Sequence, residues 1–249
     1  MLIRKIYKLR KSILRRFLFL MKKEKFFYKL NNIFLFLDLK DSIDREIYFN
    51  GYYEDEQVSY LKDSIFKFNI NYFIDIGSNI GVYALSISEQ FPDLNVIAFE
   101  PHKDAFNRME MAIKKNNFSE RIIAYPYALA NEDGEAKLFT LNRFDTSQSG
   151  GARISDKGQF TVRQKKGDDL IKLKNQKIAI KIDVEEFELQ VLNGITKLIT
   201  NNKVFLQIEI FNRNYPIISS FLENRNFKLL KEGNYTHDKR LRDYFYINF

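Results

Sequence analysis

The 249-residue sequence contains no cysteine and only two histidines, and its basic N-terminal segment contains no long apolar run. Without cysteine the chain forms neither disulfides nor thiolate sites for zinc or iron–sulfur clusters, and it suits a reducing compartment. The longest apolar run of the N-terminal segment, FLFLM, is five residues long, whereas a membrane-spanning helix needs about 20. The segment also lacks a compact signal-peptide core and a small-residue cleavage site. We therefore expect a cytoplasmic protein.

Positive charge is concentrated at the N-terminus. The formal net charge is +8, but residues 1–30 hold 11 Lys or Arg and one acid, which leaves 29 basic and 31 acidic side chains for the other 219 residues. The body of the chain therefore has no compositional reason to bind nucleic acid. Apolar residues of the N-terminal segment recur at steps of three and four: Leu2, Ile6, Leu9, Ile13, Phe17 and Leu20. This spacing predicts a basic amphipathic helical segment over residues 1–30, which either lies peripherally on an anionic membrane surface or packs on the body.

Strand-like and helical segments alternate in the second part of the chain. Residues 31–70 are expected to form a helical and loop extension, and residues 71–249 one domain with a core of its own. The predicted strands cover 71–76, 95–99, 121–125, 178–184 and 203–211, and the predicted helices cover 80–90, 103–116 and 186–200. This alternation favours an α/β fold, a mostly parallel sheet with helices on both faces.

Two regions depart from the alternation. Residues 128–141 predict a turn into an extra strand, and residues 142–169 form a polar insertion of the kind that often serves as a binding loop. The chain ends in two strand-like stretches, which predict a C-terminal antiparallel hairpin.

The segment FIDIGSNIGVYAL indicates a cofactor site. A strand ends near Asp75, a turn from Gly77 to Gly81 follows, and an apolar helix begins. Glycine at both ends of such a turn permits a sharp bend and a close approach of a ligand. Glu100 follows the next strand, where an acid accepts the hydroxyls of a ribose. The spacing is D-x-G-x-x-x-G and not the G-x-G-x-x-G of dinucleotide folds, so a nucleotide-type cofactor other than NAD is favoured.

Five segments resemble, in order, those of FkbM-family methyltransferases: GYYEDE (51–56), FIDIGSNIG (73–81), VIAFEP (96–101), ALANEDGEAKLF (128–139) and IKIDVEEFELQVLNG (180–194). The resemblance implies a Rossmann-like class I methyltransferase fold and transfer of a methyl group from S-adenosylmethionine, usually to a hydroxyl of a sugar or other small molecule. The cofactor-binding positions that we expect are Glu54, Asp75, Gly77, Asn79, Gly81, Glu100, Pro101 and Ala128. The sequence departs from the family pattern at Glu186, where the family usually has glycine after K-I-D-V-E. A side chain at this position affects how closely an acceptor can approach the site.

The segment IKIDVEEFELQVLNG places a cation and several carboxylates at the end of a strand. Lys181 and Asp183 share one face of that strand, and Glu185 continues the face if the strand extends so far. With Glu209 of the next strand they are the candidate catalytic residues, because an acceptor hydroxyl needs a base or a metal ion to take or replace its proton. The sequence does not decide whether a divalent metal ion takes part. The alternative is that these acids only start a helix, with Asp183 and Glu186 as a capping box.

We therefore expect an S-adenosylmethionine-dependent O-methyltransferase acting on a hydroxyl of a sugar, glycan precursor or related small molecule. A second hypothesis is a catalytically inactive methyltransferase fold that serves as a binding protein at the membrane surface; the intact glycine turn and Glu100 argue against it. A third, an NAD-dependent oxidoreductase, is disfavoured by the missing G-x-G-x-x-G.

Overall fold

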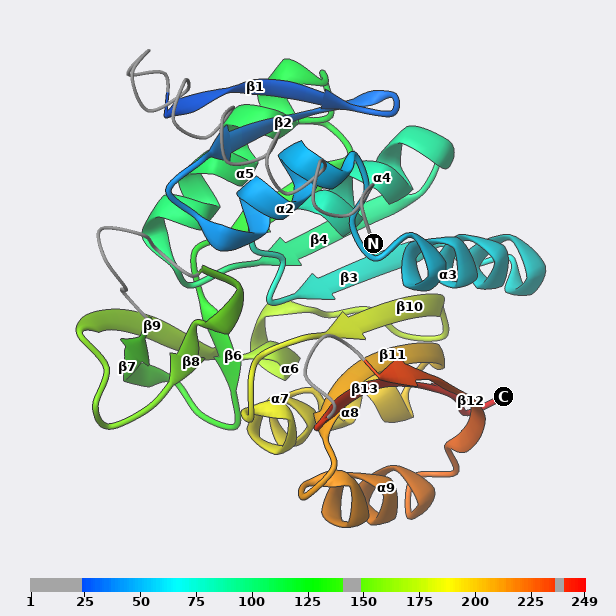
Figure 1. Cartoon of the computed structure of the whole chain (residues 1–249). Helices are drawn as coiled ribbons and strands as arrows, with labels where there is room; N and C mark the ends of the chain where they lie inside the picture. Colours follow the sequence, from blue (N-terminus) through cyan, green and yellow to red (C-terminus); the bar gives the residue numbers. More distant parts are fainter. Residues whose placement is uncertain (1–23, 141–148, 236–239) are drawn as a thin grey trace, which may run out of the picture.

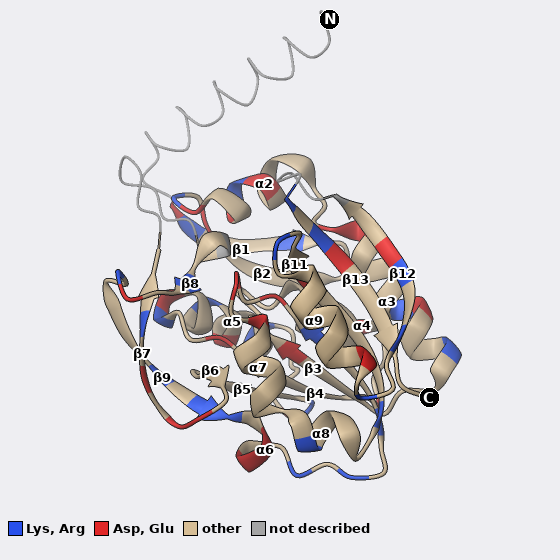
Figure 2. Ribbon diagram, turned by 90° about the horizontal axis from the view of Figure 1, so that it is seen from below, with Lys and Arg blue, Asp and Glu red and all other residues tan. Residues whose placement is uncertain are grey.

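The computed structural model describes residues 24–140, 149–235 and 240–249. Residues 1–23, which make up most of the predicted N-terminal amphipathic helix, lie outside the described residues. The binding of this segment to a membrane therefore stays a prediction. No helix within the described ranges combines the length and the apolar character needed to cross a bilayer. In Figure 2 basic and acidic residues are interspersed over the elements, in keeping with the near-neutral charge of the body.

A seven-stranded sheet forms the centre of the molecule (Figure 1). Its strands, in spatial order, are β12 (Lys228–Tyr235), β13 (Leu241–Ile247), β11 (Lys203–Phe211), β10 (Lys177–Ile182), β3 (Tyr72–Ile76), β4 (Asn95–Phe99) and β5 (Ile122–Tyr125). Neighbours from β11 to β5 run parallel, whereas β13 runs antiparallel to both β11 and β12. The structure thus confirms the predicted α/β fold with a mostly parallel sheet and a C-terminal antiparallel hairpin.

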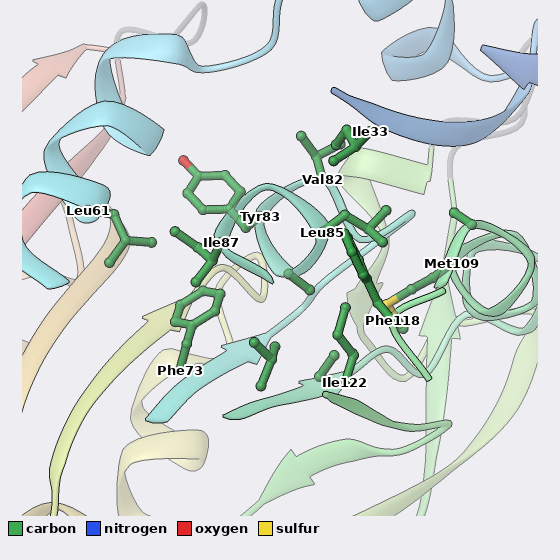
Figure 3. Close-up of a cluster of buried hydrophobic side chains, with 14 of the residues drawn as sticks. Ile33, Leu61, Phe73, Val82, Tyr83, Leu85, Ile87, Met109, Phe118 and Ile122 are labelled. Carbon is green, nitrogen blue, oxygen red and sulfur yellow. The ribbon is translucent and has the colours of Figure 1, made fainter. Parts of the chain in front are cut away.

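Side chains alternate between two cores on the two faces of this sheet. In β3, Phe73 packs with residues of α3 (Asp55–Phe68), α4 (Val82–Gln90) and α5 (Lys103–Lys115). Figure 3 shows Phe73 in this cluster beside Ile87 and Tyr83 of α4. Ile74 points the opposite way, into the core under α7 (Glu188–Gly194), α8 (Thr196–Thr200) and α9 (Tyr215–Glu223). The buried strands are therefore apolar on both faces, as expected of a parallel sheet covered by helices.

Residues 25–38 differ from the predicted helix and loop. They form an antiparallel hairpin of β1 (Lys25–Leu30) and β2 (Ile33–Asp38). The burial of β1 alternates residue by residue, which is the period of a strand, and Asn31 adopts a left-handed φ of 52° in the turn. The helices α2 (Ser42–Asn50) and α3 follow, as predicted for this extension.

The insertion after β5 forms a second sheet. Its strands are β6 (Ala128–Ala130), β9 (Phe160–Lys166), β7 (Gly134–Phe139) and β8 (Arg153–Ile154), in that spatial order, and α6 (Gly167–Leu170) leads back to β10. The 3-10 turn η1 (Ser149–Gly151) carries Ser149, whose N–H donates to Asp41 Oδ2 at 2.8 Å. The Ser149 hydroxyl also lies 3.0 Å from Asn79 Oδ1. The insertion therefore reaches the turn that follows β3.

Candidate active site

The turn between β3 and α4 is held against two neighbouring strands. Gly77 has φ +83°, and its N–H donates to Phe99 O of β4 at 2.9 Å. A Cβ on Gly77 would lie 1.8 Å from the carbonyl oxygen of Asp183, so only glycine fits. Gly81, with φ +82°, caps the N-terminus of α4. Asn79 between them also has a positive φ, of 50°. The glycine spacing of the sequence thus reflects two real geometric demands.

Glu100 lies directly beside this turn. Its Oε2 accepts the N–H of Asn79 at 2.8 Å, and its Oε1 accepts the N–H of His102 at 2.7 Å. The side chain is 6% exposed. Burial raises the pKa of Glu100 to about 7, while the two amide donors act in the opposite direction. The acid after β4 is therefore a buried carboxyl next to the glycine turn, as the sequence predicts.

Lys181 is the buried cation of the site. It projects from β10 in register with Asp75 of β3 and is 4% exposed. Its Nζ lies 2.7 Å from Asp183 Oδ2 and 4.5 Å from the centre of the Tyr83 ring. Asp183 thus supplies the negative charge that compensates this buried cation. The charges of Asp183 and then Glu54 keep the pKa of Lys181 raised despite the burial that opposes it.

Glu54 joins this group from outside the central sheet. It precedes α3, has φ +48°, and accepts the Tyr83 hydroxyl at 2.8 Å. Gln207 Nε2 lies 3.3 Å from the same hydroxyl and 2.9 Å from Asp243 Oδ1. Burial raises the pKa of Glu54 to about 7. A chain of polar side chains therefore runs from Glu54 to the C-terminal strand β13.

Three further carboxylates converge at the ends of β10 and β11. Asp183, Glu185 and Glu209 each offer an oxygen, and these oxygens all lie within 4.8 Å of one another. Burial, followed by the charge of Asp183, raises the pKa of Glu185 to about 8 and that of Glu209 well above its ordinary value. At neutral pH Glu185 therefore exchanges its proton readily, which suits general acid–base work.

Glu186 and Glu188 do not belong to this convergence. Glu186 has φ +76°, which explains why glycine is usual at its position, and it forms an ion pair with Arg213. Its N–H donates to Glu188 Oε1 at 2.7 Å. The helix α7 begins at Glu188 with Phe187 as its N-cap. The alternative in which Asp183 and Glu186 form a capping box is therefore wrong. Glu188 is the acid in the first turn of α7. The helix predicted over residues 186–200 is divided into α7 and α8.

One cavity of about 790 Å³ connects these features. Eleven of the twelve predicted site residues line it: Glu54, Asp75, Gly77, Asn79, Glu100, Pro101, Ala128, Lys181, Asp183, Glu185 and Glu209. Gly81 instead faces α5, where a Cβ would meet the side chain of Met109. The sequence prediction missed Tyr83 and Ser149, which also line the cavity. Tyr83 lies within the glycine-turn segment and could have been found there, whereas no local pattern marks Ser149.

A family model described as "Methyltransferase FkbM domain" matches residues 75–234. The chain belongs to this family. Membership confirms the predicted family and the predicted enzyme class, and with them S-adenosylmethionine as the cofactor of the FkbM domain. The matched residues include the glycine turn, Glu100 and the acids at the ends of β10 and β11, whereas Glu54 precedes them.

Other proteins resemble parts of the FkbM chain. "Hexuronic acid methyltransferase AglP" of Haloferax volcanii is 30% identical over 137 residues. The alignment covers 54% of this chain, and the chain spans about half (54%) of that relative's length. The structure of M. jannaschii TYW2 in complex with AdoMet is 10% identical, with 91% of this chain and 87% of that chain covered and a TM-score of 0.49. An uncharacterized Listeria monocytogenes protein is 13% identical, with 78% and 66% covered and a TM-score of 0.48.

Proposed function

We propose that this protein transfers a methyl group from S-adenosylmethionine to a hydroxyl oxygen of a sugar, a glycan precursor or a related small molecule. The observation that carries the proposal is the cavity of about 790 Å³, which both groups of residues share. The glycine turn and Glu100 line one part of it, and Lys181 and the acids of β10 and β11 line another. A cofactor at the turn and an acceptor at the acids would therefore share one space.

Each group of residues has a role in this proposal. The cofactor is bound by residues of the turn and of the strand ends beside it that line the cavity: Asp75, Gly77, Asn79, Glu100, Pro101 and Ala128. Gly81, which was predicted with them, shapes the turn from outside the cavity. Glu54 was predicted with them, and its contact with Tyr83 and its charge interaction with Lys181 associate it with the acceptor end as well.

The reaction at the acceptor end is an in-line displacement. The oxygen–methyl bond forms as the sulfur–methyl bond breaks, and a carboxylate takes the hydroxyl proton. Glu185 suits this step because burial raises its pKa to about 8, and Glu209 lies beside it with a pKa that burial also raises. Lys181 fixes Asp183 and balances part of the negative charge. Holding both reactants in line is worth up to roughly 7–11 kcal/mol in favourable cases.

The acceptor class is supported by the relative named as a hexuronic acid methyltransferase. The cavity is also large enough for both ligands, since small-molecule sites commonly occupy about 300–1,000 Å³. Polar and charged side chains make up a large share of its lining, which suits an acceptor rich in hydroxyl groups.

Two experiments test the function. Calorimetry with S-adenosylmethionine, its demethylated product and NAD is expected to show binding of the first two only; no heat and no thermal stabilisation with either would refute the proposal. Incubation with a panel of neutral sugars, hexuronic acids and glycan precursors, read by mass spectrometry for the added methyl group, then identifies the acceptor. Glu100→Gln should weaken cofactor binding, whereas the exposed Glu135→Gln should not.

We also propose peripheral attachment of the protein to the inner face of the membrane through its basic N-terminus. Deleting residues 1–23 removes nine of the 11 basic residues of positions 1–30 and spares β1, which begins at Lys25. Sedimentation with anionic vesicles should then be lost. Equal sedimentation of the full chain and the truncated chain would exclude this role.

A further inference from the structure

The three convergent acids come from two adjacent strands. Ile182 and Ile208 are register partners in β10 and β11, so the next residues, Asp183 and Glu209, extend on the same face of the sheet. Glu185 follows with a left-handed φ of 50° and lies near both. Within the described ranges, the Glu209 carboxylate has no hydrogen-bond or ion-pair partner, and Lys181 holds Oδ2 of Asp183 only.

The spacing of the acids fits one divalent cation. Calcium binds oxygen at about 2.3–2.6 Å and magnesium at about 2.0–2.1 Å, so two oxygens on opposite sides of one ion lie roughly 4–5 Å apart. The three oxygens of this group are within 4.8 Å of one another. Ions that prefer carboxylate oxygen are magnesium, manganese and calcium.

A second observation concerns Asp75, which is 1% exposed and lines the same cavity. It is in register with Lys181 and therefore points to the same face of the sheet as Asp183 and Glu209. The N–H of Ala84 and the hydroxyl of Ser78 favour the ionised form of Asp75, but neither reaches its carboxylate oxygens with hydrogen-bond geometry. The buried Oε1 of Gln207 on this face has no hydrogen-bond partner among the described residues. Buried acceptors without donors are rare in folded proteins and point to a missing cation or donor.

The charge of the cavity agrees with this. Nine carboxylate side chains line it, from Glu46 to Glu209, and Lys181 is the one basic side chain among the described lining residues. The cofactor would add a sulfonium and an ammonium but also a carboxylate, so the acceptor end keeps more carboxyl groups than basic groups, and protons relieve part of their charge. A bound divalent cation offsets this excess where it is densest.

We propose that Asp183, Glu185 and Glu209 bind one divalent, oxygen-preferring cation whose remaining coordination positions face the cavity. Binding of the acceptor to this ion is a second part of the inference, and it rests on the proposed methyl transfer. The acceptor would present two neighbouring oxygens to the ion, either a pair of adjacent hydroxyls or a hydroxyl beside a carboxylate. Coordination would lower the pKa of the acceptor hydroxyl, and with all three acids bound to the ion its proton would pass to solvent rather than to Glu185 or Glu209. It also lets an anionic sugar approach a cavity that otherwise repels it.

The test uses the full chain freed of metal with a chelator and titrated with Mn²⁺, with free Mn²⁺ measured by electron paramagnetic resonance. We expect saturable binding of one Mn²⁺ per chain and its displacement by Mg²⁺ or Ca²⁺. Glu209→Gln should weaken binding roughly tenfold or more, because it removes a charged ligand. Glu185→Gln is the second variant and should act in the same way if Glu209→Gln fails to fold.

The matched control is Glu56→Gln. It removes one carboxylate from the same cavity, but its side chain pairs with Lys231 outside the three acids. Its affinity for Mn²⁺ should stay within about twofold of the unaltered chain. No saturable binding below ~1 mM Mn²⁺, or equal losses in the control and in Glu209→Gln, overturns the inference.

Calorimetry with S-adenosylmethionine in the presence of EDTA separates this inference from the proposed function. Cofactor binding without Mn²⁺ binding refutes the ion site alone. Mn²⁺ binding without cofactor binding refutes the methyltransferase proposal and leaves the ion site standing.

Discussion

Replacing Gly77 by alanine tests the close contact between the β3 turn and the end of β10. A non-glycine residue at φ +83° costs about 1–2 kcal/mol through its own backbone strain. The added Cβ would also lie 1.8 Å from Asp183 O and 2.9 Å from its carbonyl carbon, and this backbone is fixed by the Asp183 N–H donating to Ile76 O. Forcing the two segments apart should cost about 1–3 kcal/mol more. The total loss of stability is about 2–5 kcal/mol.

Gly51→Ala is the matched control for this prediction. Gly51 has φ +74°, but a Cβ there would meet nothing within 4 Å. It should therefore show only the strain of about 1–2 kcal/mol. Urea denaturation of both variants should separate them by about 1–3 kcal/mol, and thermal melts by about 2–4 °C for each kcal/mol.

The variant should also bind S-adenosylmethionine more weakly, because the displaced turn lines the cofactor part of the cavity. Calorimetry measures this loss in any fraction that folds. If Gly77→Ala is no less stable than Gly51→Ala within ~0.5 kcal/mol, the close approach of the turn to Asp183 is not a constraint, and the reasoning fails.

Three further predictions follow from the described contacts. Tyr83→Phe should raise the pKa of Glu54 further, because the ionised carboxylate loses the hydroxyl that donates to it; carbon-13 NMR titration measures this, and Tyr60→Phe, which also has a lysine 4.5 Å from its ring centre, should change nothing. Glu186→Gly should raise the free energy of unfolding by up to about 1 kcal/mol, since glycine accepts φ +76° and the exposed pair with Arg213 contributes little; a loss of stability in urea would contradict this. The free energy of unfolding should fall as the pH rises. Glu54 and Glu100 have pKa values of about 7 in the folded state, against 4.5 ordinarily, so the folded state binds their protons more tightly than the unfolded chain does. Their contribution to stability is full below about pH 4.5 and is lost as the pH rises through about 7, so Glu100→Gln should flatten the difference in urea midpoint between about pH 5 and about pH 8.

Prediction from sequence succeeded where the signal is local. The strands 95–99 and 203–211 have the predicted bounds, and α5 begins at the predicted Lys103. Side-chain periodicity and the flanking turns are sufficient there, because buried parallel strands are apolar throughout and helices repeat every 3.6 residues. The N-terminal hairpin was missed because the apolar, helix-like spacing of the preceding segment was extended through residue 30, across residues that alternate with the period of a strand.

The sequence by itself determined the α/β order, the glycine turn and the acids at the strand ends, because each depends on neighbours within about one turn or strand. Only the tertiary structure decided which acids meet. The register of β10 and β11 sets Asp183 beside Glu209, and the left-handed backbone at Glu185 and Glu186 separates two adjacent carboxylates into different environments. The contact of Tyr83 with Glu54, 29 positions apart, likewise depends on how α3 packs over α4. Such contacts follow from packing between distant segments, and no local pattern encodes them.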